Sequence, residues 1–176
     1  MTVKWIAFPL HPDTPEEGLT LEALFAGRNI DIPGMLAQMR QVAAAEGLPF
    51  GDRRHTYNSR LAQELGKWAE EHGRGDDFHH LAFRAYFAEG KNLAKRDVLL
   101  DLAAAAGLSA TEAAVVLTER RYADAVDRDW AISRQMGITA VPTFSFGGRR
   151  LVGAQPYGKL RDLMAGTLPA QNGSLA

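Results

Sequence analysis

Hydrophobic residues recur at intervals of three and four along most of the chain, which is the spacing of helices with one buried face. This pattern predicts helices over residues 32–46, 60–71, 77–89, 97–106, 120–136 and 157–164, with a shorter helix that ends near residue 118. Glycines at 47, 73, 90, 107 and 137 follow the first five of these helices. Glycine readily ends a helix in a left-handed conformation, so the pattern and the stop signals agree.

Residues suited to helix starts precede several of these segments. Asp31 is placed to cap helix 32–46, and either Asn58 or Ser59 is placed to cap helix 60–71. Ser109 and Glu112 have the spacing of a capping box, in which a hydroxyl and a carboxylate each satisfy a backbone amide. The middle of the chain is therefore predicted to be entirely helical.

Strand patterns are confined to the two ends of the chain. Residues 2–8 are β-branched and aromatic and predict a buried strand, after which three prolines predict an extended loop over residues 9–18. Residues 143–146 and 149–152 predict a hairpin, because the two glycines between them accept the positive φ angles of a type I′ turn. Sheet elements at both ends with helices between them predict an α/β core that carries a helical insertion.

The composition is that of a soluble globular protein. Of the 176 residues, 46% are hydrophobic and 23% are charged. The net charge of −1 gives no bulk electrostatic reason to expect nucleic acid or a membrane surface as a partner. No apolar run approaches the ~20 residues of a membrane span and no signal peptide opens the sequence, so we expect a soluble, cytoplasmic protein.

The sequence contains no cysteine, which excludes thiol nucleophiles, disulfides and thiolate metal sites. Its five histidines are at positions 11, 55, 72, 79 and 80. The two adjacent ones would point about 100° apart on a helix and could not share a metal. We therefore expect surface histidines, and neither a metal nor a cofactor.

The other charged clusters have ordinary structural interpretations. Aspartates at 124, 127 and 129 alternate with arginines on the helix predicted over 120–136, as on an exposed helix face. Three arginine doublets are scattered and lack interleaved aromatic residues, so they do not predict nucleic-acid binding. They are Arg53-Arg54, Arg120-Arg121 and Arg149-Arg150. No phosphate-binding glycine motif occurs.

The segment from Gly137 to Phe146 carries the most specific pattern. A helix end is followed by a short loop, then by Val141-Pro142, then by a strand. Proline lacks an amide hydrogen and fits where a strand begins, and for X-Pro bonds the cis isomer lies only ~0.5–1 kcal/mol above trans. The residues alone leave the isomer of this bond open.

Segments along nearly the whole chain together resemble one family. Residues 137–156 and the last helix resemble the closing half of the thioredoxin-like fold, and residues 5–18 look like its second strand and following loop. Short matches at 58–62, 85–90 and 98–108 follow the order of a helical insertion. The resemblance is to DsbA-like oxidoreductases of the FrnE-like branch, which are related to 2-hydroxychromene-2-carboxylate isomerases and kappa-type glutathione transferases.

This resemblance implies a domain plan and a binding site. The implied thioredoxin-like core covers residues 1–50 and 126–168, the helical insertion 51–125, and a flexible tail 169–176. The Val141-Pro142 bond is expected to be cis and to face the family's catalytic site. The expected binding residues offer main-chain groups to an extended peptide or to glutathione, and they are Ala140, Val141, Pro142 and Thr143.

One part of the family pattern is missing. The first strand and the Cys-x-x-Cys segment, or the serine of the isomerase and transferase relatives, would precede residue 1. Disulfide exchange requires sulfur, so we expect no catalytic residue and no redox activity in this chain. Because the family's first strand is central, either residues 2–8 fill its place, another chain supplies a strand, or an edge stays exposed. An exposed edge would favour a homodimer or a strand swap.

Three functions are compatible with the resemblance. The first is a thiol-disulfide oxidoreductase family protein that is redox-inactive as this chain. The second is a non-catalytic module that binds a peptide or glutathione at the Val141-Pro142 loop. The third is an activity like that of the 2-hydroxychromene-2-carboxylate isomerases, which ranks last because the aligned serine is also missing.

Overall fold

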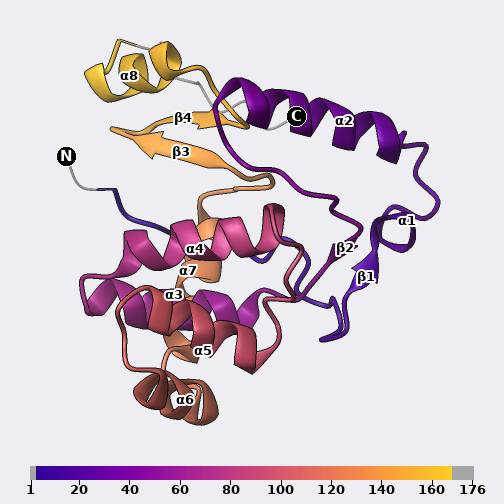
Figure 1. The fold of residues 1–176 in the computed structure, drawn as a ribbon. Coiled ribbons are helices and arrows are strands. Elements are labelled where there is room, and N and C mark those ends of the chain that lie inside the picture. Colours follow the sequence, from indigo (N-terminus) through magenta and orange to yellow (C-terminus); the bar gives the residue numbers. More distant parts are fainter. Residues whose placement is uncertain (1–2, 168–176) are drawn as a thin grey trace. The chain divides into compact units, whose positions relative to one another are not determined.

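The computed structural model describes residues 3–167, which form eight helices and four short strands (Figure 1). The strands are β1 (Leu19–Thr20), β2 (His55–Thr56), β3 (Thr143–Phe146) and β4 (Arg149–Val152). The helices are α1 (Leu21–Leu24), α2 (Ile32–Ala45), α3 (Arg60–Glu71), α4 (Gly75–Phe87), α5 (Arg96–Ala105), α6 (Ala110–Glu119), α7 (Ala123–Gln135) and α8 (Tyr157–Ala165). These residues separate into two compact units, His11–Arg128 and the set 3–10 with 129–167.

The larger unit is built around a helical bundle. Helix α3 contacts α4, α5 and α6, while α5 also packs against α4 and α6. The apolar stripe of each helix meets in one core, where Leu65, Phe78, Leu99 and Leu117 are at most 1% exposed. Burial of such a side chain contributes ~1.5–3 kcal/mol, so this core is the main source of the bundle's stability.

Some of the predicted sequence signals begin and end helices, but Ser59, the N-cap residue of α3, makes no side-chain capping bond. Asp31 Oδ1 accepts a hydrogen bond from the Gly34 N–H at 3.0 Å, and Ser109 Oγ accepts one from the Glu112 N–H at 3.2 Å. Among the described residues the Glu112 carboxylate does not return a bond to the Ser109 amide, so half of the predicted capping box is formed. Gly47, just beyond α2, has φ +67°. The predicted bounds of α3 are confirmed, and those of α2, α4 and α5 hold within two residues.

A short ladder in the larger unit was not predicted. Strand β1 pairs antiparallel with β2, with Leu19 opposite Thr56 and Thr20 opposite His55. Each strand has two residues, too few for a period-two pattern in the sequence. Asn58 ties the preceding loop to this region, because its Nδ2 donates to the carbonyl oxygens of Pro12 and Thr14.

The smaller unit contains the predicted hairpin, which is confirmed with its bounds. Strands β3 and β4 pair antiparallel from Thr143–Val152 to Phe146–Arg149, and Gly147 and Gly148 form the turn with φ of +55° and +76°. Helix α8 packs against both strands. Its bounds agree with the predicted helix to within one residue.

The predicted strand over residues 2–8 is wrong for the described part, residues 3–8. The main chain of Ala7 forms hydrogen bonds with side chains of α7 and not with a neighbouring strand. The Ala7 N–H donates to Asp129 Oδ2 at 2.9 Å, and Ser133 Oγ donates to the Ala7 carbonyl oxygen at 3.3 Å. Residues 9–18 form the loop that the prolines predicted.

The helix predicted to begin at Arg120 begins at Ala123. Arg120 has φ +52° and ends α6 in a left-handed conformation, so it cannot also start a helix. The tail predicted over 169–176 lies outside the described residues. The two compact units divide the chain after residues 10 and 128. The predicted division into a thioredoxin-like core over 1–50 and 126–168 and a helical insertion over 51–125 uses other boundaries and stays a prediction.

Candidate functional site

The four predicted binding residues lie in the loop before β3 and at the first position of that strand. The Val141–Pro142 peptide bond is cis. Hydrogen bonds fix the loop on either side of it. Thr143 Oγ1 donates to the Ala140 carbonyl oxygen at 2.6 Å, and the Gly153 N–H donates to the Pro142 carbonyl oxygen at 2.8 Å. The loop is therefore anchored both within itself and to the residue that follows β4.

Val141 lies between these anchors with its main chain open. Its residue exposure is 41%, and Ala140 and Pro142 are also exposed, whereas Thr143 is partly buried. Within residues 3–167, no group hydrogen-bonds to the N–H or the carbonyl oxygen of Val141. One donor and one acceptor are thus available at the surface beside the hairpin.

The hairpin register extends this row of open main-chain groups. A two-residue turn is closed by a hydrogen-bonded pair, here Phe146 and Arg149, and such pairs alternate along an antiparallel ladder. The next hydrogen-bonded pair is Phe144 and Leu151, and the Gly153-to-Pro142 bond continues the same alternation. The N–H and carbonyl groups of Thr143 and Ser145 therefore face away from β4.

Val141, Thr143 and Ser145 form one row, which we call the β3 edge. Among the described residues the sheet has two strands, so no third strand pairs with this edge. Sequence reasoning missed Ser145, although hairpin register counted back from Gly147-Gly148 could have found it. Ser145 thus lies in the same row as Val141 and Thr143, whereas a binding role for residues 140–143 stays a prediction.

The two strands differ in how an outer edge is protected. Charged side chains on an edge strand discourage pairing with another chain. Strand β4 carries Arg149 and Arg150, whereas β3 has the sequence Thr-Phe-Ser-Phe and no charge. Phe144 and Phe146 are 36% and 51% exposed, so apolar surface accompanies the open β3 edge.

One histidine, His79, lies in a small charged cluster on α3 and α4. His79 Nε2 lies 3.2 Å from Glu70 Oε1, and Lys67 Nζ lies 3.0 Å from Glu70 Oε2. Burial raises the pKa of Glu70, but hydrogen bonds from His79 and Lys67 outweigh it and hold the pKa below its ordinary value. No group of three or more metal-ligating side chains occurs in the part of the chain that the structure describes.

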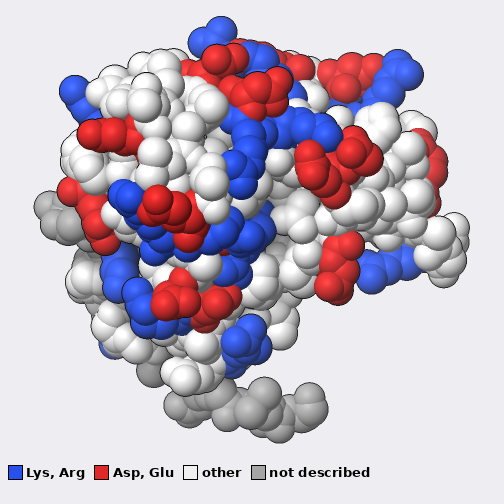
Figure 2. Space-filling view, turned by 90° about the horizontal axis from the view of Figure 1, so that it is seen from below, with Lys and Arg blue, Asp and Glu red and all other residues white. Residues whose placement is uncertain are grey.

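Charges of both signs intermix over the face shown in Figure 2. One acidic residue of the predicted exposed stripe is not exposed, since Asp129 is 6% exposed and accepts the bond from Ala7. None of the helices described between residues 3 and 167 is long and apolar enough to cross a bilayer.

Comparisons with known proteins connect this geometry to a family. Residues 1–165 match the family model of the DSBA-like thioredoxin domain. The structure is similar to that of a probable DsbA oxidoreductase, SCO1869 from Streptomyces coelicolor, with a TM-score of 0.80 and 26% identity over 95% of this chain and 75% of that one. It shares its fold with the cytosolic disulfide reductase DsbM from Pseudomonas aeruginosa, solved with GSH, at a TM-score of 0.51 and 24% identity over 77% of this chain and 71% of that one.

A curated relative is similar over a shorter stretch. The uncharacterized protein YwbO of Bacillus subtilis (strain 168) is 35% identical over 103 residues, which are 57% of this chain and 50% of that protein. The chain therefore spans half the length of this relative. The predicted thioredoxin-like α/β fold with a helical insertion is confirmed by the family match and the SCO1869 structure. Because the family match covers nearly all of the sequence, this chain belongs to the family of DSBA-like thioredoxin domains.

Proposed function

We propose that this chain is a FrnE-like member of its family that binds an extended peptide along the β3 edge and does not itself exchange disulfides. The observation that carries the proposal is the row of open main-chain groups at Val141, Thr143 and Ser145. Extended peptides bind proteins in this way, by adding a strand to an exposed edge. The predicted cytoplasmic location is part of this proposal.

The edge has the features that strand addition requires. In strand addition, main-chain hydrogen bonds supply affinity, and contacts of the protein surface with alternate side chains of the peptide supply specificity. Anchors at Ala140 and Pro142 hold Val141 in place before a peptide arrives, which lowers the ordering cost of binding. The exposed rings of Phe144 and Phe146 favour a peptide with apolar side chains.

The proposed redox inactivity of this chain has a chemical basis. Thiol–disulfide exchange proceeds by attack of a thiolate on a disulfide, and the sequence contains no cysteine. In an insulin-reduction assay with dithiothreitol, we expect the rate with this chain to equal the rate without it. Turnover above that uncatalysed rate would contradict this half of the proposal.

Peptide binding is tested by NMR titration of the ¹⁵N-labelled chain with alkylated insulin B chain. We expect saturable amide shifts at Val141, Thr143 and Ser145. Ser145→Pro removes one outward N–H and should weaken binding. Arg150→Pro is the matched control, because Arg150 stands opposite Ser145 and its amide faces the other edge.

Three outcomes separate the alternatives. Shifts confined to the β3 edge that Ser145→Pro weakens support the proposal, whereas silence at millimolar peptide rejects it. GSH as a second probe distinguishes a tripeptide from a longer segment, which is relevant because DsbM, a protein of the same fold, was solved with GSH. A concentration-dependent dimer in sedimentation, abolished by Ser145→Pro, would show that a second copy occupies the edge.

A further inference from the structure

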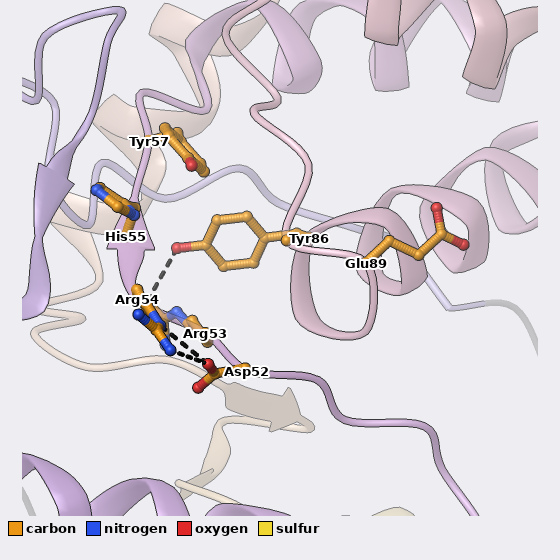
Figure 3. A pocket seen from close by; sticks show the side chains of 8 residues that line it. Asp52, Arg53, Arg54, His55, Tyr57, Tyr86 and Glu89 are labelled. Atoms are coloured by element: carbon orange, nitrogen blue, oxygen red, sulfur yellow. Dashed lines mark hydrogen bonds and ion pairs between the residues drawn. The ribbon is translucent and has the colours of Figure 1, made fainter.

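A cavity of about 250 Å³ lies in the larger unit, between residues that the proposed peptide site does not use. It is bordered by the segment that leads into β2 and by the end of α4. Figure 3 shows Tyr86 reaching across it toward Arg53, with His55 and Tyr57 on one side. The full lining is Asp52, Arg53, Arg54, His55, Tyr57, Tyr86, Glu89 and Gly90.

Arg53 is held in place by its neighbours. Its Nη2 donates to Tyr86 Oη at 2.9 Å, and Tyr86 Oη donates to Oγ1 of the buried Thr56 at 3.2 Å. The guanidinium carbon lies 5.0 Å from the ring centroid of Tyr86 and 5.5 Å from that of Phe87. The cation is therefore oriented against two aromatic rings, and no carboxylate of residues 3–167 pairs with it.

The described part of the chain satisfies one of the hydrogen-bond donors of this guanidinium. Arginine has five N–H donors, and within residues 3–167 the only acceptor for the Arg53 side chain is Tyr86 Oη. Its Nε is buried and has no acceptor among the described residues. Buried donors in proteins are nearly always paired, so an unpaired one requires an explanation.

The other charges at the cavity are already neutralised. Asp52 Oδ2 lies 2.8 Å from Arg54 Nη2, and Glu89 Oε2 lies 2.9 Å from Lys91 Nζ. No acidic side chain of the described chain pairs with Arg53. A positive charge thus remains at this end of the cavity.

The positive charge of Arg53 affects the pKa of a nearby histidine, His11. Burial lowers the pKa of His11, and the guanidiniums of Arg28 and Arg53 lower it further. Because these charges act together on one imidazole, the region around Arg53 favours anions.

We propose that this cavity binds the carboxylate or phosphate group of a small metabolite on the guanidinium of Arg53. Arginine presents a planar fork that matches both oxyanions. The cavity is smaller than the roughly 300–1,000 Å³ of typical ligand pockets, which points to a small molecule. His55 and Tyr57, whose rings stack 6.0 Å apart at 11°, offer a flat wall for its carbon skeleton.

The test uses the full chain and the Nε–Hε resonance of Arg53 in ¹⁵N NMR spectra. Inorganic phosphate and benzoate are titrated separately at constant ionic strength, with sodium chloride as the control salt. We expect a saturable shift of the Arg53 resonance with at least one oxyanion. Benzoate binding alone would identify a carboxylate ligand, and phosphate binding alone a phosphorylated one.

Substitutions assign the binding to Arg53. Arg53→Met keeps an unbranched stem, and we expect it to raise the Kd at least about tenfold, since hydrogen bonds to charged groups carry that much binding energy. Arg54→Met is the matched control and should change the Kd by less than about twofold, because Arg54 is exposed and paired with Asp52. If Arg53→Met does not fold, Arg53→Lys serves instead, since it keeps the charge without the fork.

Two results overturn the proposal. One is an Arg53 resonance that shifts equally in chloride and in the oxyanions. The other is an unchanged Kd in the Arg53 variant.

Discussion

Glu64 and Arg120 meet inside the helical bundle through two hydrogen bonds, although they are 56 residues apart in sequence. Arg120 Nε donates to Glu64 Oε2 at 2.7 Å, and Nη2 donates to Oε1. Arg60 Nε donates to the same Oε1 at 2.6 Å. The Glu64 side chain is 1% exposed, so one buried carboxylate links α3 to the residue that ends α6.

Replacement of Glu64 by glutamine should destabilise the bundle by ~3 kcal/mol. This is the lower end of the range for removing one partner of a buried ion pair. The lower end applies because Arg60 keeps Asp127 at 2.7 Å and the Arg120 side chain is 46% exposed. Urea denaturation followed by circular dichroism measures the change in the free energy of unfolding.

The matched control is Glu119→Gln, at a carboxylate 54% exposed that pairs with Arg121. Exposed pairs contribute ~0–1 kcal/mol, so this variant should stay close to wild type. Equal losses in the two variants would contradict the structural role given to Glu64.

The contribution of Glu64 should depend on pH in a defined direction. Burial raises the pKa of Glu64, but hydrogen bonds from Arg120 and Arg60 outweigh it and lower the pKa below 4.5. The unfolded chain therefore takes up the proton first on acidification. The stabilisation is complete above pH 4.5 and is lost as the pH falls through the folded pKa.

The difference in unfolding free energy between wild type and Glu64→Gln isolates this effect from that of Glu70, whose pKa is also lowered. We expect this difference to be constant near neutral pH and to shrink below pH 4.5. Urea titrations at a series of pH values measure it. A difference that stays the same down to acidic pH would show that the carboxylate charge is not what stabilises the bundle.

The Glu64–Arg120 pair shows where the sequence stops being informative. Helix bounds and the hairpin were predictable because caps, glycines and periodicity act over a few residues. Arg120, by contrast, reads in the sequence as part of an exposed helix face, since its partner Glu64 lies 56 residues earlier in the chain. The strand predicted over residues 2–8 is wrong for the same reason. The hydrogen-bond partners of Ala7 lie in α7, more than 120 residues along the chain.

In the candidate sites, too, local features could be predicted from the sequence, and contacts between distant segments could not. Residues 140–143 are predicted from a family resemblance, and the place of Ser145 beside them follows from hairpin register once β3 and β4 are paired. In the sequence, Arg53 belongs to one of three scattered doublets without interleaved aromatic residues. Its aromatic contacts come from Tyr86 and Phe87, which only the fold brings near.

The hairpin turn gives a third prediction, at Gly148. This residue has φ +76°, and a Cβ placed there would meet nothing within 4 Å, so a substitution is penalised by backbone conformation and not by a clash. Gly148→Val should cost roughly 1–2 kcal/mol, the cost of a left-handed conformation for a side chain with a Cβ. Hydrogen exchange at the Phe144 amide, a ladder donor, reports the opening of the hairpin.

Gly158→Ala is the control for this prediction. Gly158 lies in α8, has no positive φ, and also has open space where a Cβ would lie. Alanine should stabilise α8 by ~0.5–1 kcal/mol. Faster exchange at Phe144 in Gly148→Val but not in Gly158→Ala is the expected pattern, and unchanged exchange in Gly148→Val would refute the assigned turn.

The electrostatics around Arg53 give the last prediction. Burial lowers the pKa of His11, and Arg28 and Arg53 lower it further, so Arg53→Met should raise this pKa toward its ordinary value of 6.5. NMR titration of the His11 ring signals measures the change, and Arg54→Met is the control because Arg54 is not among the charges that act on His11. An oxyanion bound at Arg53 should raise the same pKa in the wild type, since it offsets the guanidinium charge without altering the fold. If the His11 pKa responds to Arg53→Met but not to saturating oxyanion, the anion binds away from Arg53. If the His11 pKa does not respond to the substitution, the two side chains are not electrostatically coupled.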